Sequence, residues 1–361
     1  MNKSFWNGKS VVVTGHTGFK GSWLSLWLSS MGAKVHGYAL PPETQPNLFT
    51  LLNIQDKIES STFGDVRDSD GLKKFLKEKK PEIVLHLAAQ ALVKKGYEDP
   101  INTYAINVMG TVCLLDAVRT TPSIKAVVNV TTDKCYENKE WVWAYKETDR
   151  LGGYDPYSNS KACSELVTSA FRDSYFNLQD YSVKHNVLVA SARAGNVIGG
   201  GDWATDRLIP DIMQSFNFKK TIVLRNPSAI RPWQHVLEPL RGYLVLAEKL
   251  YQGEKWAAKG WNFAPKSEDA KSVEWIVKYL IKSHDETQEY TIDSANQPHE
   301  ANLLKLDYSQ AKKYLNWEPS LALEQTLDHI SSWYRSFQTS KDMNQETMDF
   351  IHLYEQLNGI H

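Results

Sequence analysis

The sequence predicts an α/β fold in which a doubly wound parallel sheet carries a smaller lobe, built mostly from C-terminal residues. Three observations predict it. Short runs of β-branched and aliphatic residues alternate with helical patterns through the first half of the 361-residue chain. These runs are apolar on both faces, as in a parallel sheet covered by helices on both sides. After Gly195 the alternation gives way to a stretch rich in glycine and proline.

The first strand is predicted at 10–14, where a β-branched run ends in a glycine-rich turn. The helix that follows, at 22–31, has apolar residues at helical spacing and stops at Gly32. The chain then extends again over 33–40. These three segments form a βαβ unit, the building block of a parallel sheet.

Later segments repeat the alternation. A short strand at 62–66 precedes a helix at 68–79, which has an aspartate at its start and Pro81 just after its end. The remaining elements are a strand at 82–89, a long helix at 99–119, a strand at 126–132, a helix at 157–175 and a strand at 186–194.

The change of texture after Gly195 sets the predicted domain boundaries. Residues 1–196 form the sheet domain. A helical pattern at 234–250 lies within a returning segment, 234–262, which we expect to pack back on that domain. The lobe then consists of 197–233 and 263–361.

The charge balance excludes several function classes. Lys+Arg is 41 and Asp+Glu is 42, so the formal net charge is −1, which disfavours a nucleic-acid binder or an electrostatic membrane binder. No apolar run is expected to span a membrane, and no signal pattern is evident. Cys113, Cys135 and Cys163 lie in no CxxC or Cys/His cluster, so we expect reduced thiols, no metal site and a cytoplasmic protein.

Three glycines, Gly15, Gly18 and Gly21, lie between the first strand and the first helix. The first suits a tight turn, the second a close approach of the backbone to a diphosphate, and the third close packing of helix on strand. The helix N-terminus then offers N–H groups and a positive dipole end to phosphates. This position in a βαβ unit predicts a Rossmann-type dinucleotide site.

Tyr157 and Lys161 are four residues apart at the start of a predicted helix, so they share one face. Tyrosine has an ordinary pKa of about 10, and lowering it by about 3 units takes roughly 4 kcal/mol. The Lys161 ammonium and an oxidised nicotinamide ring together can supply this. The pair is common on surface helices, but here it lies downstream of a dinucleotide site, which favours proton transfer.

The GxxGxxG spacing resembles the extended branch of the short-chain dehydrogenase/reductase family. Gly64-Asp65-Val66 and His86-Leu87-Ala88-Ala89-Gln90 are similar to that branch as well. The resemblance implies NAD as cofactor, with the adenine amino group on Asp65. The implied cofactor contacts are the three glycines with Thr17, Phe19, Asp65, Val66, Leu87, Ala88, Ala89, Thr131, Tyr157 and Lys161.

The end of the second strand departs from that pattern. An acid should stand there for the ribose of NAD, or an arginine nearby for the phosphate of NADP. The chain instead has Tyr38-Ala39-Leu40-Pro41-Pro42, and Glu43 comes late. Lys20 is either a ligand of a 2′-phosphate or a solvated surface lysine. The sequence favours NAD, with its ribose held loosely.

Thr132-Asp133-Lys134 ends the fifth predicted strand. Thr132 occupies the family's Ser/Thr position, whose hydroxyl bonds the substrate oxygen being oxidised. An acid at Asp133 is typical of the nucleotide-sugar 4,6-dehydratases, which remove water. Those enzymes usually carry Glu next, where this chain has Lys134. Lys134 is a base, a cation that stabilises an enolate, or a solvated bystander.

Several further segments resemble the branch of these dehydratases that acts on CDP-glucose, in which Lys follows the Asp. They are Asp133–Trp141, Gly152–Tyr157, Gly199–Trp203, Arg207–Asp211 and Ile230–Val236. The resemblance implies CDP-glucose as substrate, a role in deoxysugar and lipopolysaccharide biosynthesis, and substrate contacts at Gln90, Asn196, Arg207 and Arg231. The helices at 99–119 and 157–175 imply a homodimer or homotetramer.

Two other readings remain open. One is a nucleotide-sugar 4-epimerase or another NAD(P)-dependent oxidoreductase, which needs no acid at Asp133. The other is a cofactor-sensing protein without chemistry, which needs neither Thr132 nor the Tyr157–Lys161 pair.

Overall fold

A computed structural model of the chain describes residues 1–293 and 303–360. Its centre is a seven-stranded parallel sheet with the strand order β11-β6-β5-β4-β1-β2-β3. The strands are β1 (Ser10–Thr14), β2 (Lys34–Ala39), β3 (Ser60–Phe63), β4 (Ile83–His86), β5 (Ala126–Val130), β6 (Leu188–Ala194) and β11 (Gly260–Phe263). The order reverses between β1 and β4, and such a switch point opens a crevice at the carboxyl ends of the strands. The predicted Rossmann-type sheet is confirmed.

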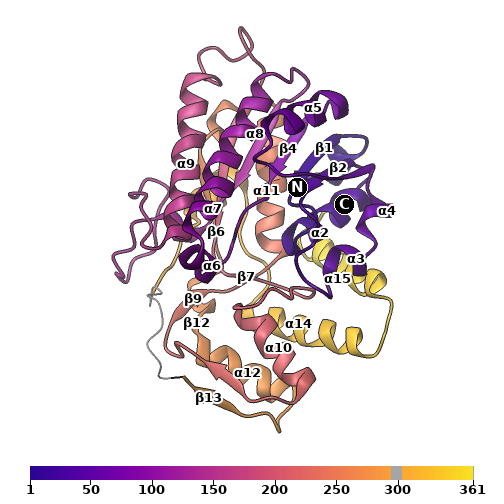
Figure 1. Ribbon diagram of the computed structural model, residues 1–361, viewed down its shortest axis with the longest axis vertical. Coiled ribbons are helices and arrows are strands. Elements are labelled where there is room, and N and C mark those ends of the chain that lie inside the picture. Colours follow the sequence, from indigo (N-terminus) through magenta and orange to yellow (C-terminus); the bar gives the residue numbers. More distant parts are fainter. Residues whose placement is uncertain (294–302, 361) are drawn as a thin grey trace.

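Helices cover both faces of this sheet (Figure 1). One layer holds α5 (Ser69–Lys79), α8 (Gly110–Arg119) and α9 (Pro156–Ser174); the other holds α2 (Phe19–Ser30) and α11 (Leu237–Tyr251). Side chains alternate between the layers along each strand. Val12 and Val127 therefore join the core under α5 and α8, whereas Val13 and Val128 join the core under α2 and α11.

A smaller group of elements lies beyond the carboxyl edge of the sheet (Figure 1). It contains α10 (Leu208–Phe218), α12 (Val273–His284) and α14 (Leu323–Gln338). Three short strand pairs support it: β8 (Ile222–Leu224) with β13 (Tyr290–Ile292), β9 (Ile230–Pro232) with β12 (Ala270–Ser272), and β7 (Val197–Ile198) with β10 (Gln234–His235). Part of the predicted lobe, residues 294–302 and 361, lies outside the described residues.

The last helix, α15 (Met343–Leu357), returns to the sheet domain. Glu355 on α15 accepts a hydrogen bond from Trp27 Nε1 of α2 at 3.0 Å and pairs with Lys3 at 2.8 Å. Short elements complete the fold: α1 (Lys3–Trp6), α3 (Leu48–Leu51), α4 (Ile54–Lys57), α6 (Val93–Glu98), α13 (Ser309–Leu315), and 3₁₀ turns at Asp133–Cys135, Lys255–Ala257 and Ser267–Asp269.

Several predicted boundaries were wrong for identifiable reasons. The strand predicted at 62–66 ends at Phe63, where its partner β2 also ends. The strand predicted at 82–89 ends at His86, because its partner β1 leaves the sheet there for the glycine-rich turn. The helix predicted at 22–31 begins at Phe19, with Gly18 as its N-cap. The helix predicted at 234–250 begins at Leu237, because the preceding residues pair with β7. The short strand β11 was not predicted.

The long helix predicted at 99–119 is continuous but not uniform. It consists of α7 (Pro100–Tyr104), a π-helical turn at Ala105–Met109, and α8. The π turn presents Asn107, whose side chain bonds both the Gln90 backbone and Ser160 Oγ of α9. Such π turns often lie near functional sites.

This same helix corrects the expectation that no apolar run reaches the length of a membrane span. Over Pro100–Arg119 its mean hydropathy is 1.3, enough for a span by length and composition, and half of that window is buried inside the protein. Core helices of globular proteins pass the same test.

Candidate active site

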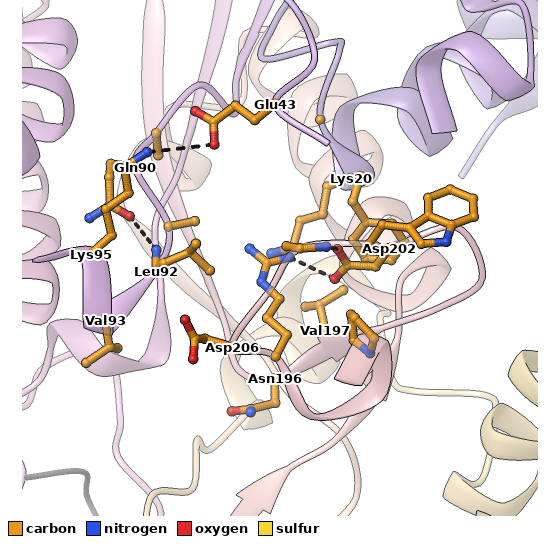
Figure 2. A pocket seen from close by; sticks show the side chains of 18 of the residues that line it. Lys20, Glu43, Gln90, Leu92, Val93, Lys95, Asn196, Val197, Asp202 and Asp206 are labelled. Atoms are coloured by element: carbon orange, nitrogen blue, oxygen red, sulfur yellow. Dashed lines mark hydrogen bonds and ion pairs between the residues drawn. The ribbon is translucent and has the colours of Figure 1, made fainter. Parts of the chain in front are cut away.

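A cavity of about 650 Å³ lies at the carboxyl ends of β1, β4, β5 and β6, between the sheet and the lobe. Every residue that the sequence analysis proposed for cofactor, substrate or chemistry lines this cavity. They come from elements far apart in the chain, which meet because parallel strands present their carboxyl ends at one edge. Figure 2 shows part of the lining.

The glycine-rich turn forms one end of the cavity. Gly15 has φ 75°, and a Cβ there would lie 2.8 Å from Ala88 N. A Cβ on Gly21 would overlap the Gly15 carbonyl. Gly18 caps α2, whose first N–H groups point at the cavity. The backbone is therefore open to a diphosphate lying against a helix N-terminus, which fits a dinucleotide.

The ribose end of this turn has no acid at the tip of β2. Thr17 Oγ1 donates to the Leu40 carbonyl at 2.8 Å, which ties the turn to the chain leaving β2. Glu43 is 70% exposed and faces Lys95 of α6 at 3.9 Å across the cavity mouth (Figure 2). Asp65 is engaged by Arg67 at 2.5 Å, and those hydrogen bonds lower the pKa of Asp65.

Thr132 and Asp133 lie where β5 ends. Thr132 caps a 3₁₀ turn that begins at Asp133, and its hydroxyl donates to Asp133 Oδ1 at 2.9 Å. Asp133 is 2% exposed, and its Oδ2 has no hydrogen-bond partner among the described residues. Burial raises the pKa of Asp133. A carboxyl group in this setting favours its protonated form and can serve as an acid.

Tyr157 lies in the first turn of α9, with its hydroxyl hydrogen-bonded to Thr132. Burial raises the pKa of Tyr157 to about 12, and the charge of Arg207 opposes this rise. Lys161 donates instead to the Val130 carbonyl at 3.0 Å, and burial lowers its pKa to about 8. The expected lowering of the pKa of Tyr157 depends on Lys161 together with an oxidised nicotinamide ring, so it stays a prediction for the site with its cofactor.

Lys20 is a site residue whose position the sequence did not predict. It neither sits on the surface nor faces the ribose; it reaches into the cavity near Asp202 (Figure 2). Burial, then the nearby Arg207 and Lys161, lowers the pKa of Lys20 to about 7. Arg207 itself is held by Asp202 at 2.8 Å. Lys20, Lys161 and Arg207 thus all line the same cavity as Tyr157.

A buried ion pair lies behind these groups and was also missed. Glu165, one turn after Lys161 on α9, pairs with Arg193 of β6 at 2.8 Å, and both side chains are nearly inaccessible. Glu165 also accepts hydrogen bonds from Thr131 and Ser191. This network fixes the ends of β5 and β6 against α9. The sequence did offer one signal for Glu165, because Tyr157, Lys161 and Glu165 follow one another at four-residue spacing on one helix face.

The remaining residues proposed to contact the substrate or take part in elimination differ in burial and in their hydrogen-bond partners. Arg231 on β9 is buried, lines the cavity and approaches Asp133 closely enough to oppose the rise in its pKa. Asn196 and Lys134 line the cavity and are half-buried. Gln90 donates to Thr103 Oγ1 at 2.8 Å and accepts from Leu92 N at 2.5 Å, so its amide orders the loop after β4.

Nothing in the described part of the chain groups three or more His, Cys, Asp or Glu residues in a way that could hold a metal ion. The cavity presents hydroxyl, carboxyl and cationic side chains beside a dinucleotide cradle. Thr132, Tyr157 and Lys161 at the edge of such a sheet define an oxidoreductase-type site of the extended short-chain dehydrogenase/reductase class.

Comparison with known proteins narrows this class. The family model described as GDP-mannose 4,6 dehydratase matches residues 12–330, and the chain belongs to that family. A CDP-glucose 4,6-dehydratase from Salmonella typhimurium is 56% identical over 344 residues, which cover 95% of each chain. A dTDP-glucose 4,6-dehydratase from Xanthomonas campestris is 25% identical, over 91% of this chain and 93% of its own.

Solved structures agree on the fold. A dTDP-glucose 4,6-dehydratase from Streptomyces venezuelae superposes with a TM-score of 0.76 at 22% identity, over 92% of this chain and 98% of its own. A UDP-glucose 4-epimerase from Thermotoga maritima superposes with a TM-score of 0.75 at 20% identity, over 91% of this chain and 99% of its own. The fold is thus shared by dehydratases and epimerases, and the side chains of the site must separate them.

Proposed function

We propose that the protein is an NAD-dependent CDP-glucose 4,6-dehydratase that converts CDP-glucose to CDP-4-keto-6-deoxyglucose. The observation that carries this is the 56% identity, over 95% of both chains, to an enzyme of that name. The site supports it independently, because a buried acid, Asp133, lies directly beside the oxidation hydroxyls Thr132 and Tyr157. An epimerase has no use for an acid at that place.

NAD fits the glycine-rich cradle, and the S. venezuelae dehydratase was solved with NAD bound. When bound, NAD accepts the hydride from sugar C4 and later returns it to C6. The residues that would hold it are the three glycines, Thr17 and Phe19 at the diphosphate and Asp65 with Val66 near the adenine. The positive nicotinamide adds the charge that Tyr157 lacks in the protein alone.

Oxidation at C4 is the task of Tyr157 and Thr132. Thr132 holds the C4 hydroxyl, and Tyr157, as phenolate, takes its proton while C4 loses hydride. Lys161 keeps a positive charge near the phenolate through its anchor on the Val130 carbonyl. The new C4 ketone then acidifies the hydrogen on C5.

Elimination is the task of Asp133 and its neighbour Lys134. Asp133 gives its proton to the C6 hydroxyl, the C6–O bond breaks and water leaves, while the C5 proton is lost to a base. Lys134 serves either as that base in its neutral form or as a cation beside the C5 enolate. Hydride then adds to C6 and a proton to C5, so the net change is the loss of one water.

The diphosphate of the substrate is assigned to Arg207, Arg231 and Asn196, which line the lobe side of the cavity. Arginine suits phosphate because its guanidinium can donate two parallel hydrogen bonds. The lobe accordingly binds the nucleotide sugar, and the sheet domain binds NAD.

The protein is further proposed to act in the cytoplasm, in deoxysugar or lipopolysaccharide synthesis, without nucleic-acid or membrane partners. We assign it a homodimeric or homotetrameric state. The support is apolar surface on the helices α7 to α9, where Ile101 is 84%, Met109 51% and Leu166 57% exposed.

Mass spectrometry of CDP-glucose incubated with the purified protein, with and without added NAD, tests the function. The proposal predicts loss of one water from CDP-glucose, with no net reduction of NAD, and little reaction of UDP-glucose. An unchanged mass with altered sugar stereochemistry would support the epimerase reading instead, which the structural neighbours alone would allow.

A further inference from the structure

Helix α10 presents a polar stripe to the cavity. Arg207 is its N-cap, and Asp211 and Ser215 follow at intervals of four residues; all three line the cavity. Ile212 and Phe216 of the same helix are buried in the core, and Ile212 also borders the cavity. Four helical residues rise about 6 Å, so Asp211 lies roughly one turn deeper along the lobe than Arg207.

Asp211 differs from most carboxylates around it in having no ion pair. Six acidic residues line the cavity. Within residues 1–293 and 303–360, four of them are ion-paired with lysine or arginine: Glu43, Asp65, Asp202 and Asp206. The two without such a pair are Asp133 and Asp211. The first is the proposed acid, and the second lies on the lobe side without an assigned task.

The cavity that Asp211 lines also has apolar walls, and a backbone group bonds the Asp211 carboxylate. The main-chain N–H of Asp206 hydrogen-bonds the Asp211 carboxylate. The apolar lining of the cavity on the lobe side includes Ile222, Leu224, Ala229 and Val273, of which the first three are buried. Apolar walls with one fixed polar group are typical of a site that receives an aromatic ring.

We propose that Asp211 selects the nucleobase by accepting a hydrogen bond from the exocyclic amino group of cytosine. This rests on the proposed function. With the diphosphate on Arg207, the base lies one ribose further along α10, at the level of Asp211. Cytosine offers an amino donor at C4, whereas uracil and thymine offer a carbonyl oxygen there. A carboxylate attracts the first and repels the second.

The test compares binding of CDP and UDP, which differ only in the base, by isothermal titration calorimetry. The wild-type chain is expected to bind CDP roughly tenfold or more tighter than UDP. Asp211→Asn keeps the shape of the side chain and can turn either amide atom to the base, so the preference should fall to about threefold or less. Asp211→Glu should retain part of it. Asp70→Asn, an exposed carboxylate on α5, is the matched control and should change neither constant.

The outcomes separate this inference from the function on which it rests. If wild type removes water from CDP-glucose but Asp211→Asn keeps the full CDP preference, the assignment of Asp211 is overturned and the function stands. Equal weakening of CDP and UDP binding in Asp211→Asn also overturns it, because that result indicates a structural role. If wild type neither prefers CDP nor dehydrates CDP-glucose, the proposed function itself fails.

Discussion

The hydroxyl of Thr132 donates a hydrogen bond to Asp133 Oδ1 at 2.9 Å. This contact joins the residue proposed to hold the oxygen at C4 to the residue proposed to protonate the oxygen at C6. Tyr157 bonds the same hydroxyl. Oxidation and elimination therefore share one short chain of side chains, so a change at its middle should affect both steps.

Thr132→Val removes the shared hydroxyl and keeps the shape of the side chain. Tyr157 and Asp133 each lose a hydrogen bond, and kcat for water loss should fall about a hundredfold. Thr132→Ser keeps the hydroxyl and should stay within about tenfold of wild type. Steady-state assays with CDP-glucose measure both. If kcat fell equally in the two variants, the hydroxyl group of Thr132 would not be required for catalysis.

Asp133→Asn separates the two halves of the reaction. The amide cannot give up a proton to the C6 hydroxyl, so water loss should fall by about 10²–10⁴. Oxidation at C4 depends on Tyr157 and should continue, so reduced nicotinamide should accumulate up to one equivalent per site. Absorbance of the reduced cofactor after mixing with CDP-glucose is the readout. A variant that neither oxidises nor dehydrates would contradict this division of labour.

Glu165→Gln breaks the buried ion pair and leaves Arg193 charged in the interior. We expect a loss of about 3–5 kcal/mol of folding stability, seen as a lower denaturation midpoint. Asp180→Asn breaks an exposed ion pair, in which Asp180 lies 3.1 Å from Lys184. This variant should lose at most about 0.5 kcal/mol of folding stability. If the two variants lost similar amounts of folding stability, burial would not determine how much the Glu165–Arg193 pair stabilises the fold.

The protein should lose stability in mild acid because several histidines are buried in their neutral form. His235 Nε2 lies 3.1 Å from His329 Nδ1 between α14 and the start of α11. Burial lowers the pKa of His329 to about 3 and that of His86 also to about 3. The unfolded chain takes up these protons near pH 6.5 and the folded chain does not. Stability is therefore present above pH 6.5 and is lost as pH falls toward 3.

Urea denaturation at a series of pH values between 7 and 4.5 measures this loss. Each such histidine contributes about 1.4 kcal/mol per pH unit below its unfolded pKa. His329→Gln should reduce the slope by about that amount, whereas His352→Gln, on the exposed face of α15, should leave the slope unchanged. An unaltered slope in His329→Gln would show that His329 is not kept neutral by the fold.

Much of the fold could be predicted because its signals are local. Glycines at fixed spacing after a β-branched strand, and strands apolar on both faces, specify the sheet and its cofactor turn. β11 escaped because four residues, Gly260–Phe263, carry too little periodicity to be recognised. The start of α11 escaped because the pairing of Gln234 with β7 is a long-range contact.

The proposed catalytic side chains were predicted from their spacing and from resemblance, whereas their neighbours depend on packing. Lys20 reads as a surface lysine in sequence, but α2 begins at Phe19 and its first turn points into the cavity. Asp211 stands out because it forms no ion pair with the described residues. The sequence cannot show this, because ion pairing depends on which side chains surround Asp211 in the folded protein. The raised pKa of Tyr157 in the protein alone could likewise not be predicted, because desolvation is a property of the folded site.

The most direct test of the central claim follows the hydrogen on C4. CDP-glucose carrying deuterium at C4 is incubated with the purified enzyme and NAD, and the product is examined by nuclear magnetic resonance and mass spectrometry. The account predicts deuterium in the C6 methyl group, one water lost and no net reduction of NAD. Deuterium retained at C4, or transferred to NAD that accumulates in reduced form, would contradict it.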